Sequence, residues 1–82
     1  MQTLYNIVGG KAQALEFNVR SQSDVVGVPL SELRLKRNVL LCCISRHGKI
    51  IIPGGGDRVE LGDTVVVVTT DRSLNDLKDI LA

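Results

Sequence analysis

Apolar and polar residues alternate along residues 14–20, where Leu15, Phe17 and Val19 are each followed by a polar residue. Successive side chains of an extended strand point to opposite faces. This period of two therefore predicts a strand with one buried face and one face open to water.

Two other segments contain an apolar run that does not alternate with polar residues, residues 39–45 (VLLCCIS) and 64–70 (TVVVVTT). Such runs predict strands whose two faces are both apolar. Residues 50–52 form a third apolar run, separated from residues 39–45 by a short polar stretch that contains Gly48. This arrangement is typical of a β-hairpin.

Two segments have the spacing of short helices. In residues 28–35, Pro29 suits the first helical turn, and leucines follow at helical spacing. In the last ten residues, Ser73 is a predicted helix cap, with Asp76 three positions later. The apolar stripe of this predicted C-terminal helix consists of Leu74, Leu77, Ile80 and Leu81.

Residues 1–10 are interpreted as a lead-in, and residues 11–82 as the core of a single domain. In the lead-in, the spacing of Leu4, Ile7 and Val8 predicts one or two helical turns. The glycines at positions 9 and 10 would end them as a C-cap.

The segments together predict an α+β domain. It has a small, mainly antiparallel sheet of about four strands, a short helix after the first strand and a C-terminal helix. Two helices are too few to cover both faces of such a sheet, and an exposed apolar face needs a cover. A second copy of the chain is the simplest cover, so the pattern predicts a homodimer.

The composition limits the classes of function. A chain of 82 residues builds one small core, here from Val, Leu and Ile, since it contains one Tyr, one Phe and no Trp. The net charge of +1 and the scarcity of aromatic residues argue against a nucleic-acid-binding domain. Residues 33–56 carry five basic residues and no acidic one. This basic block either attracts phosphate groups or forms a solvated rim.

The location is predicted from the cysteines and from the hydropathy. Cys42 and Cys43 are neighbours on a predicted strand, which would turn them to opposite faces, poorly placed to bridge each other. Unpaired cysteines fit a reducing compartment. The chain shows neither the pattern of a signal peptide nor an apolar run near the ~18 residues of a membrane span. We therefore expect a soluble, cytoplasmic protein.

The glycines at positions 54–56 raise the question of a phosphate-binding loop. Such loops lie between a strand and a helix, and the P-loop ends in Lys-Ser or Lys-Thr. Here Asp57 and Arg58 follow, and the next predicted element is a strand. The prediction is a turn, with Pro53 at the end of the preceding strand.

A catalytic or metal site is not predicted. Cys43 and His47 would share a strand face, as a cysteine–histidine nucleophilic pair requires. Their apolar surroundings disfavour a thiolate, however. With Cys42 they lack the spacing and the fourth ligand of a zinc site. A small enzyme that uses Cys43 and His47 stays as an alternative, to be separated by the reactivity of the thiols.

Five motifs in order resemble the C-terminal subdomain of the regulator of potassium conductance family, the module at the end of Trk- and Ktr-type potassium-uptake regulators. They are GKAQALEFNV (10–19), VVGVPLSELRL (25–35), LLCCISRHGKIIIP (40–53), LGDTVVVVTT (61–70) and the last predicted helix.

The resemblance implies a non-catalytic cytosolic domain that forms homodimers and regulates a membrane potassium transporter subunit. It also implies that residues 1–82 belong to a longer regulator. A Rossmann subdomain there binds adenine nucleotides or nicotinamide dinucleotide, and these cofactors are not expected in this domain. Similar modules are appended to anion symporters, cation/proton antiporters and transcription regulators, and these alternatives stay open.

Some members of the family bind cyclic di-AMP in the cleft between two C-terminal subdomains. Carried over to this sequence, the resemblance implies a site formed by Val28, Arg34, Asn38, Val39 and Pro53. Arg34 would bind a phosphate, and Asn38 a base edge or a phosphate. The other three residues would contact the adenines. A two-fold symmetric ligand would suit a two-fold interface.

Overall fold

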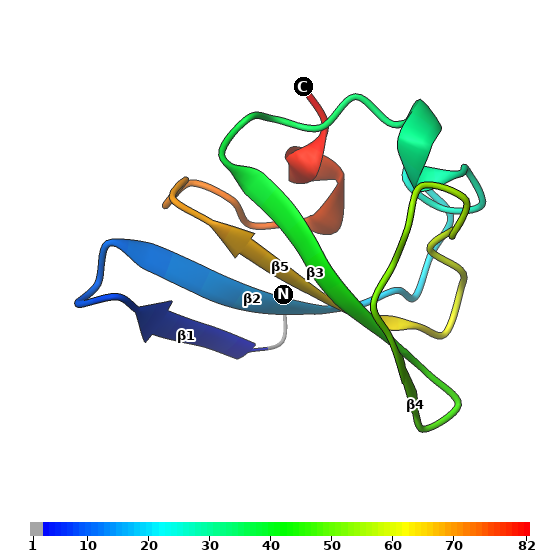
Figure 1. Cartoon of the computed structure of the whole chain (residues 1–82), viewed down its shortest axis with the longest axis horizontal. Helices are drawn as coiled ribbons and strands as arrows, with labels where there is room; N and C mark the ends of the chain where they lie inside the picture. The colour runs from blue at the N-terminus through cyan, green and yellow to red at the C-terminus, as the bar shows by residue number, and fades with distance from the viewer. Residues whose placement is uncertain (1–2) are drawn as a thin grey trace.

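One antiparallel sheet of five strands organises the computed structural model, which describes residues 3–82. The elements in chain order are β1 (Thr3–Ile7), β2 (Ala12–Asn18), the 3-10 turn η1 (Leu30–Glu32), β3 (Val39–Arg46), β4 (Lys49–Ile51), β5 (Thr64–Thr69) and the 3-10 turn η2 (Leu77–Ile80). Across the sheet the order is β1-β2-β5-β3-β4 (Figure 1). The predicted antiparallel sheet is confirmed. Residues 3–82 contain no α-helix, however, and five strands rather than about four, so the domain is mainly β rather than α+β.

Strand β5 lies at the centre of the sheet and pairs with β2 on one edge and β3 on the other. Val65 and Val67 on β5 have no exposed surface. Leu15 and Leu41 pair with Val67 from the two sides, and Ile44 pairs with Val65. Side chains that pair across strands lie on the same face, so these residues form the centre of the core.

Strand β1 occupies the segment for which the sequence pattern predicts helical turns, and that prediction is wrong. β1 pairs antiparallel with β2 along its whole length. The connecting residues Val8, Gly9 and Gly10 all have positive φ, between 52° and 82°. Glycine adopts this conformation at little cost, so the two glycines reverse the chain into a hairpin instead of capping a helix. Residues 1 and 2 of the lead-in lie outside the described residues.

The predicted C-terminal helix is reduced to η2. Asp76 rather than Ser73 is its N-cap: the Asp76 carboxylate accepts a hydrogen bond from the Leu77 backbone N–H at 2.7 Å. The Ser73 hydroxyl donates instead to the Asp71 carboxylate at 2.6 Å. Short polar side chains that bond to nearby groups compete with helix formation. The inward face of η2 is still buried, as its apolar stripe predicts.

The predicted helix over residues 28–35 is likewise reduced to the single turn η1. Pro29 precedes η1, but Leu33 after it is already extended, with φ −83° and ψ 137°. Leu35 then pairs with Leu81 in an isolated β-bridge. This pairing keeps residues 33–35 extended beside the C-terminal residues, so the helical geometry ends after Glu32.

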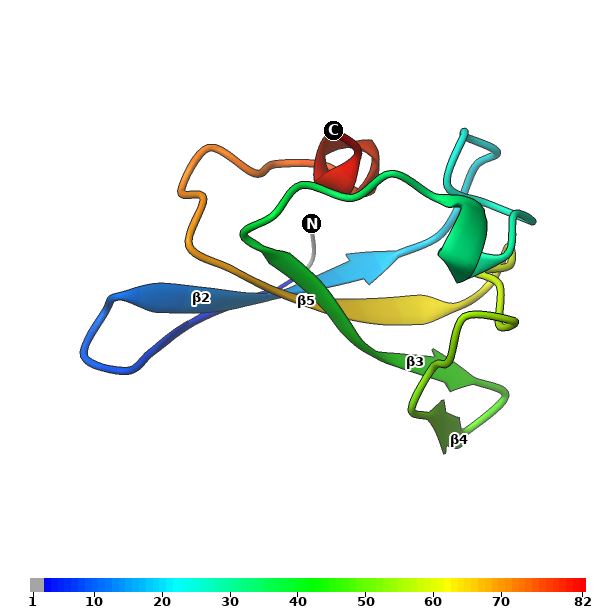
Figure 2. The ribbon, with the colours of Figure 1, turned by 45° about the horizontal axis from the view of Figure 1, so that its top comes forward.

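The core lies between the sheet and the irregular segments. The segment between β2 and β3, together with η1 and η2, covers one face of the sheet (Figure 2). Val26 in this segment pairs with Val59 in a β-bridge, and both are buried, as is Val25. No segment of residues 3–82 covers the opposite face, which we call the outer face (Figure 2).

A buried carboxylate fixes the turn before β5. Asp63 is 1% exposed, and its side chain accepts hydrogen bonds from Arg46 Nε (2.9 Å), Arg46 Nη2 (2.8 Å) and the Glu60 backbone N–H (2.8 Å). Burial by itself would raise the pKa of the Asp63 carboxyl. The Arg46 guanidinium and the Glu60 N–H outweigh it and hold that pKa below its ordinary value. The end of β3 is thereby joined to the start of β5.

The three glycines at positions 54–56 form a turn, as predicted. The Gly54 backbone N–H donates to the Asp57 carboxylate at 2.7 Å, so an internal carboxylate takes the place that an anion would take. A Cβ on Gly55 would lie 3.1 Å from Ser31 Cβ. Glycine is therefore favoured at position 55 by the close approach of the η1 segment.

Replacing Asp63 with alanine should destabilise the domain by about 2 kcal/mol, because the change removes three hydrogen bonds and leaves part of the Arg46 charge unpaired. Glu60→Ala is the matched control: Glu60 also pairs with Arg46, at 3.0 Å, but its side chain is 57% exposed. Its loss should cost less than about 1 kcal/mol. Urea unfolding measures both. Equal costs would contradict the assigned role of Asp63.

The same carboxylate predicts a pH dependence. Because the pKa of Asp63 is lowered by folding, its contribution to stability is complete above its unfolded pKa of about 4. The contribution is lost as the pH falls from there through the lower folded pKa. In Asp63→Asn the free energy of unfolding should therefore decline less below pH 4 than in the unchanged protein. Parallel pH profiles of the two proteins would contradict the prediction.

Candidate functional site

The outer face is the main candidate surface for an interaction. The strand register aligns its side chains in three rows across the sheet. The rows are Tyr5, Ala14, Val68 and Leu40; then Thr3, Glu16, Val66 and Cys43; then Asn18, Thr64, Ser45 and Ile50.

The first of these rows is entirely apolar. Tyr5 is 54% exposed and Leu40 is 61% exposed, on strands that flank the pair β2–β5. Glu16 is the one charged side chain in the three rows. Large apolar side chains that gather on an open sheet face mark an interaction surface. The two apolar faces predicted for β3 and β5 from sequence are thus present, with one of them uncovered.

A β-bulge in β3 changes the predicted placement of the cysteines. The register with β5 shifts between Leu41 and Cys43, which leaves Cys42 as an extra residue. The core-facing Leu41 and Ile44 are buried, and both residues between them are half-buried. Cys42 and Cys43 therefore both lie off the core face, and the prediction of opposite faces is wrong. Both thiols are free.

The Cys43 and His47 pair lacks the geometry of a nucleophilic site. β3 ends at Arg46, and His47 lies in the following turn with φ 51°. Burial, the neighbouring Cys42 and the Glu16 charge raise the pKa of the Cys43 thiol, which disfavours the reactive thiolate. Within residues 3–82, no three His, Cys, Asp or Glu side chains group as metal ligands.

The five residues of the implied nucleotide site fall into two groups. Val28 and Pro53 flank two loops that are joined by backbone hydrogen bonds, from Leu30 N–H to Asp57 O (2.9 Å) and from Ser31 N–H to Gly55 O (2.9 Å). Figure 1 shows these loops side by side at η1. Both residues are half-buried.

The second group lies on the segment that leads into β3. The Arg34 carbonyl accepts a hydrogen bond from the Ala82 N–H (2.8 Å), and the Asn38 carbonyl accepts one from the Thr70 N–H (3.3 Å). Val39 begins β3. The Arg34 side chain is exposed, and within residues 3–82 its guanidinium makes no hydrogen bond or ion pair. The backbone of this group is therefore held while the Arg34 charge stays available to an anion.

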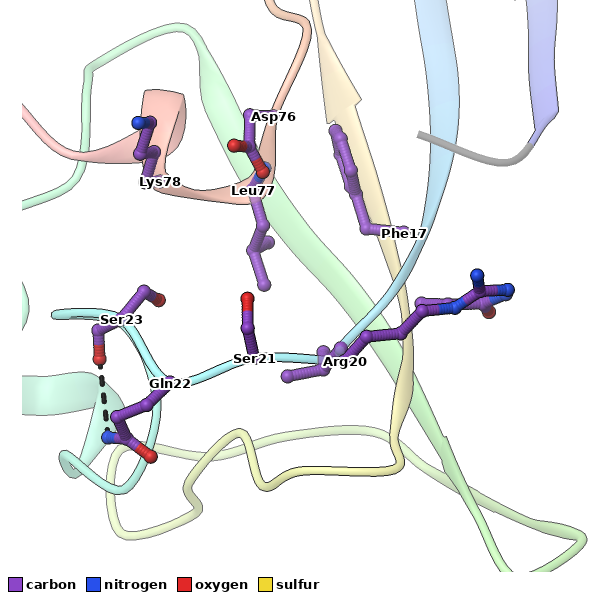
Figure 3. Close-up of a pocket in the computed structure, with 10 residues that line it drawn as sticks. Phe17, Arg20, Ser21, Gln22, Ser23, Asp76, Leu77 and Lys78 are labelled. Atoms are coloured by element: carbon purple, nitrogen blue, oxygen red, sulfur yellow. Dashed lines mark hydrogen bonds between the residues drawn. The ribbon is translucent and has the colours of Figure 1, made fainter.

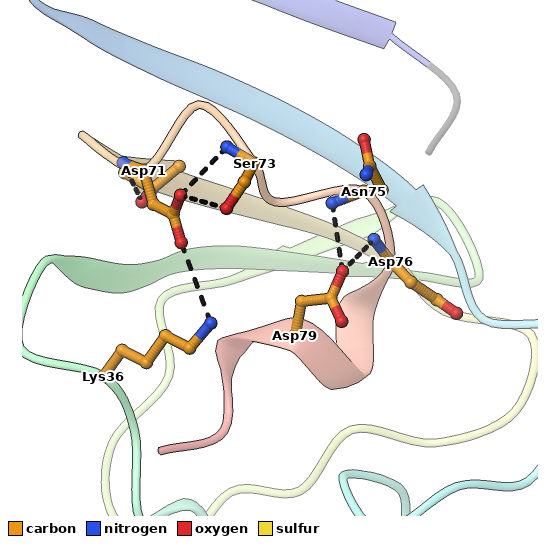
Figure 4. A network of polar contacts seen from close by, with 7 residues as sticks. Lys36, Asp71, Ser73, Asn75, Asp76 and Asp79 are labelled. Carbon is orange, nitrogen blue, oxygen red and sulfur yellow. Dashed lines mark hydrogen bonds and ion pairs between the residues drawn. The ribbon is translucent and has the colours of Figure 1, made fainter.

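A polar network of Asp71, Ser73, Asn75, Asp76 and Asp79 fixes the segment between β5 and η2, and Lys36 reaches it from the segment that leads into β3 (Figure 4). The Ser73 hydroxyl and backbone N–H lower the pKa of the Asp71 carboxyl, which also pairs with Lys36 Nζ at 3.7 Å. The N–H groups of Asn75 and Asp76 lower the pKa of the Asp79 carboxyl in the same way. The carboxylates are thus occupied by structural partners.

Two hollows lie away from the implied nucleotide site. One, of about 210 Å³, lies between the end of β2, residues 20–23 and the start of η2 (Figure 3). Two of its polar groups are engaged, since Gln22 Nε2 donates to the Val26 carbonyl and Asp76 caps η2. Arg20 extends away from η2 (Figure 3). The other hollow, of about 220 Å³, borders the Arg46 and Asp63 ion pair, whose groups are bound to each other.

The sequence patterns miss two features of these surfaces. The bulge at Cys42 has no local signal, because the whole run from Val39 to Ile44 is apolar. The pairing of Arg46 with Asp63 joins residues 17 positions apart, and its one sequence signal is an acid in a predicted turn before a strand.

The sequence is similar to a family model and to several curated proteins. Residues 14–82 match the family model of the TrkA-C domain. The chain is 35% identical over 72 residues to the Trk system potassium uptake protein TrkA homolog 2 of Methanosarcina mazei, and 35% identical over 72 residues to a TrkA homolog of Archaeoglobus fulgidus. Each alignment covers 88% of this chain and 16% of the relative. A TrkA homolog of Pyrococcus abyssi is 27% identical over 71 residues, with 85% of this chain and 31% of the relative covered.

The family match extends from β2 through η2, and so covers the central strand, the bulged hairpin and the C-terminal turn. No helix within residues 3–82 is long and apolar enough to span a membrane. The chain belongs to the TrkA-C domain family, and it is similar to one part of proteins that are named for potassium uptake.

Proposed function

We propose that this chain is a non-catalytic regulatory and dimerisation domain of a Trk-type potassium uptake system. Two chains pair through the apolar row of the outer face, and this row is the observation that carries the proposal. The names of the similar proteins support the potassium system. In the proposal the domain is cytoplasmic, follows a Rossmann-type subdomain and acts on a membrane transporter subunit.

A two-fold dimer through this face has a physical reason. Tyr5 and Leu40 expose large apolar surfaces, and their removal from water stabilises an assembly by about 25 cal/mol per Å². In a two-fold interface each residue contributes twice. The third row is polar apart from Ile50. With the Thr64 hydroxyl hydrogen-bonded to Asn18 at 3.0 Å, its polar part would form part of a wetter rim.

Leu40→Glu should weaken the dimer by more than about tenfold, because it places a charge in each half of an apolar contact. The matched control is Leu61→Glu. Leu61 is 56% exposed, similar to Leu40, but it lies in the turn before β5 and off the outer face. Sedimentation equilibrium measures both association constants. A monomer at tens of micromolar in the unchanged protein, or equal effects of the two changes, would contradict the dimer.

We also propose that two chains bind one cyclic di-AMP through Val28, Arg34, Asn38, Val39 and Pro53. Because the segment between β2 and β3 covers the face opposite the outer face, this ligand would bridge two chains at a second two-fold contact, separate from the dimer through the outer face. The support is the resemblance, the exposed Arg34 guanidinium and the held backbone beneath it. Two Arg34 side chains related by a two-fold axis would match the two phosphates of the ligand.

Calorimetric titration with cyclic di-AMP should give saturable binding at one ligand per two chains. Arg34→Ala should weaken it by roughly 10-fold or more, the loss expected for a charge-assisted hydrogen bond. Arg37→Ala is the control, since Arg37 is also exposed and basic, three positions away. Absence of binding by the unchanged protein removes this site. Equal losses in both variants would reduce it to a general attraction by the basic segment.

A further inference from the structure

The bulge in β3 brings the two cysteines together on the outer face. Leu41 and Ile44 are three positions apart, yet both face the core, because Cys42 is the extra residue of the bulge. After burial, the neighbouring Cys42 thiol is the next cause that raises the pKa of the Cys43 thiol, so the two thiols interact. Both residues are half-buried rather than enclosed, so the pair borders the open face of the sheet.

A direct disulfide between these neighbours is disfavoured. Adjacent Cα atoms are about 3.8 Å apart, whereas disulfides prefer roughly 4.4 Å or more. A third atom placed between the two sulfurs lengthens the bridge and relieves this restriction. Adjacent thiols are thus suited to a soft centre that takes two sulfur ligands at once.

We propose that Cys42 and Cys43 form a two-thiol site for trivalent arsenicals. With an organic arsenic(III) oxide, two As–S bonds form and the arsenic–oxygen bonding breaks. The oxygen leaves as water with the two thiol protons. Arsenic stays trivalent and keeps its organic group, so the step needs neither an oxidant nor a reductant.

The surroundings favour two-point ligation over the reaction of a single thiol. Burial, together with Cys42 and Glu16, raises the pKa of the Cys43 thiol, so reagents that need a thiolate react slowly there. Once one sulfur holds the arsenic, the second is a neighbour at high effective concentration. Selectivity for a bidentate reagent follows from this arrangement.

Occupation of the site affects the dimer, a consequence that rests on the proposed function. Cys43 lies in the second row of the outer face, beside Val66 and next to the apolar row that contains Leu40. An arsenical with a phenyl group would occupy space that the partner chain needs. Arsenical binding and dimerisation through this face therefore exclude each other.

The test is titration with phenylarsine oxide, followed by native mass spectrometry. The unchanged chain should bind one arsenical with loss of one water. Cys42→Ser and Cys43→Ser should each bind about 100-fold more weakly, because one-point attachment loses the chelate. Undiminished binding by either variant would overturn the proposal. Circular dichroism confirms that the variants fold.

A second measurement needs no variant. After saturation with phenylarsine oxide, both thiols of the unchanged chain should resist a maleimide in urea, whereas one reactive thiol per chain would overturn the two-thiol site.

Sedimentation of the saturated protein tests whether arsenical binding and dimerisation exclude each other. A monomer supports this exclusion, and a dimer that retains the arsenical overturns it. Mass spectrometry counts the arsenical in monomers and dimers alike, so failure of the proposed dimer is distinguishable from failure of the site.

Discussion

Strand β5 makes the domain possible, because it hydrogen-bonds to strands on both edges while its side chains alternate between two different surroundings. Val65 and Val67 are fully buried in the core, whereas Val66 and Val68 lie on the outer face. A strand with valines on both faces satisfies its backbone fully but needs two covers for its side chains. The loops and 3-10 turns supply only one cover (Figure 2). The open face is therefore a consequence of the same strand that holds the core.

The strands were predictable because their signal is local. Alternation identifies β2, and the apolar runs identify β3, β4 and β5 to within about two residues of their bounds. The helices were not predictable from leucine spacing alone. Around η2, the carboxylates of Asp71 and Asp79 hold turns, and bridges such as Leu35 with Leu81 extend the chain. Strand β1 was missed because Gly9 and Gly10 serve a hairpin as well as a helix end.

The candidate functional surfaces also differ in how far the sequence predicts them. The uncovered apolar face follows from counting helices against strands, and the structure has even fewer helices than the pattern predicts. The expected nucleotide site came from the family resemblance, and two of its five residues, Val28 and Pro53, flank loops that meet only in the folded chain. The bulge at Cys42 could not be predicted, because an insertion of one residue in an apolar run leaves the hydropathy pattern unchanged.

The bulge also has a consequence for the interface itself. A bulge bends its strand and increases the local twist, and here it occurs where β3 pairs with the central strand. Without it, alternation would turn one of the two cysteines into the core, and Leu41 and Ile44 could not both face inward. The core packing therefore requires the bulge, and the bulge in turn presents two thiols beside the apolar row. The chemistry of the outer face is thus a by-product of how β3 fills the core.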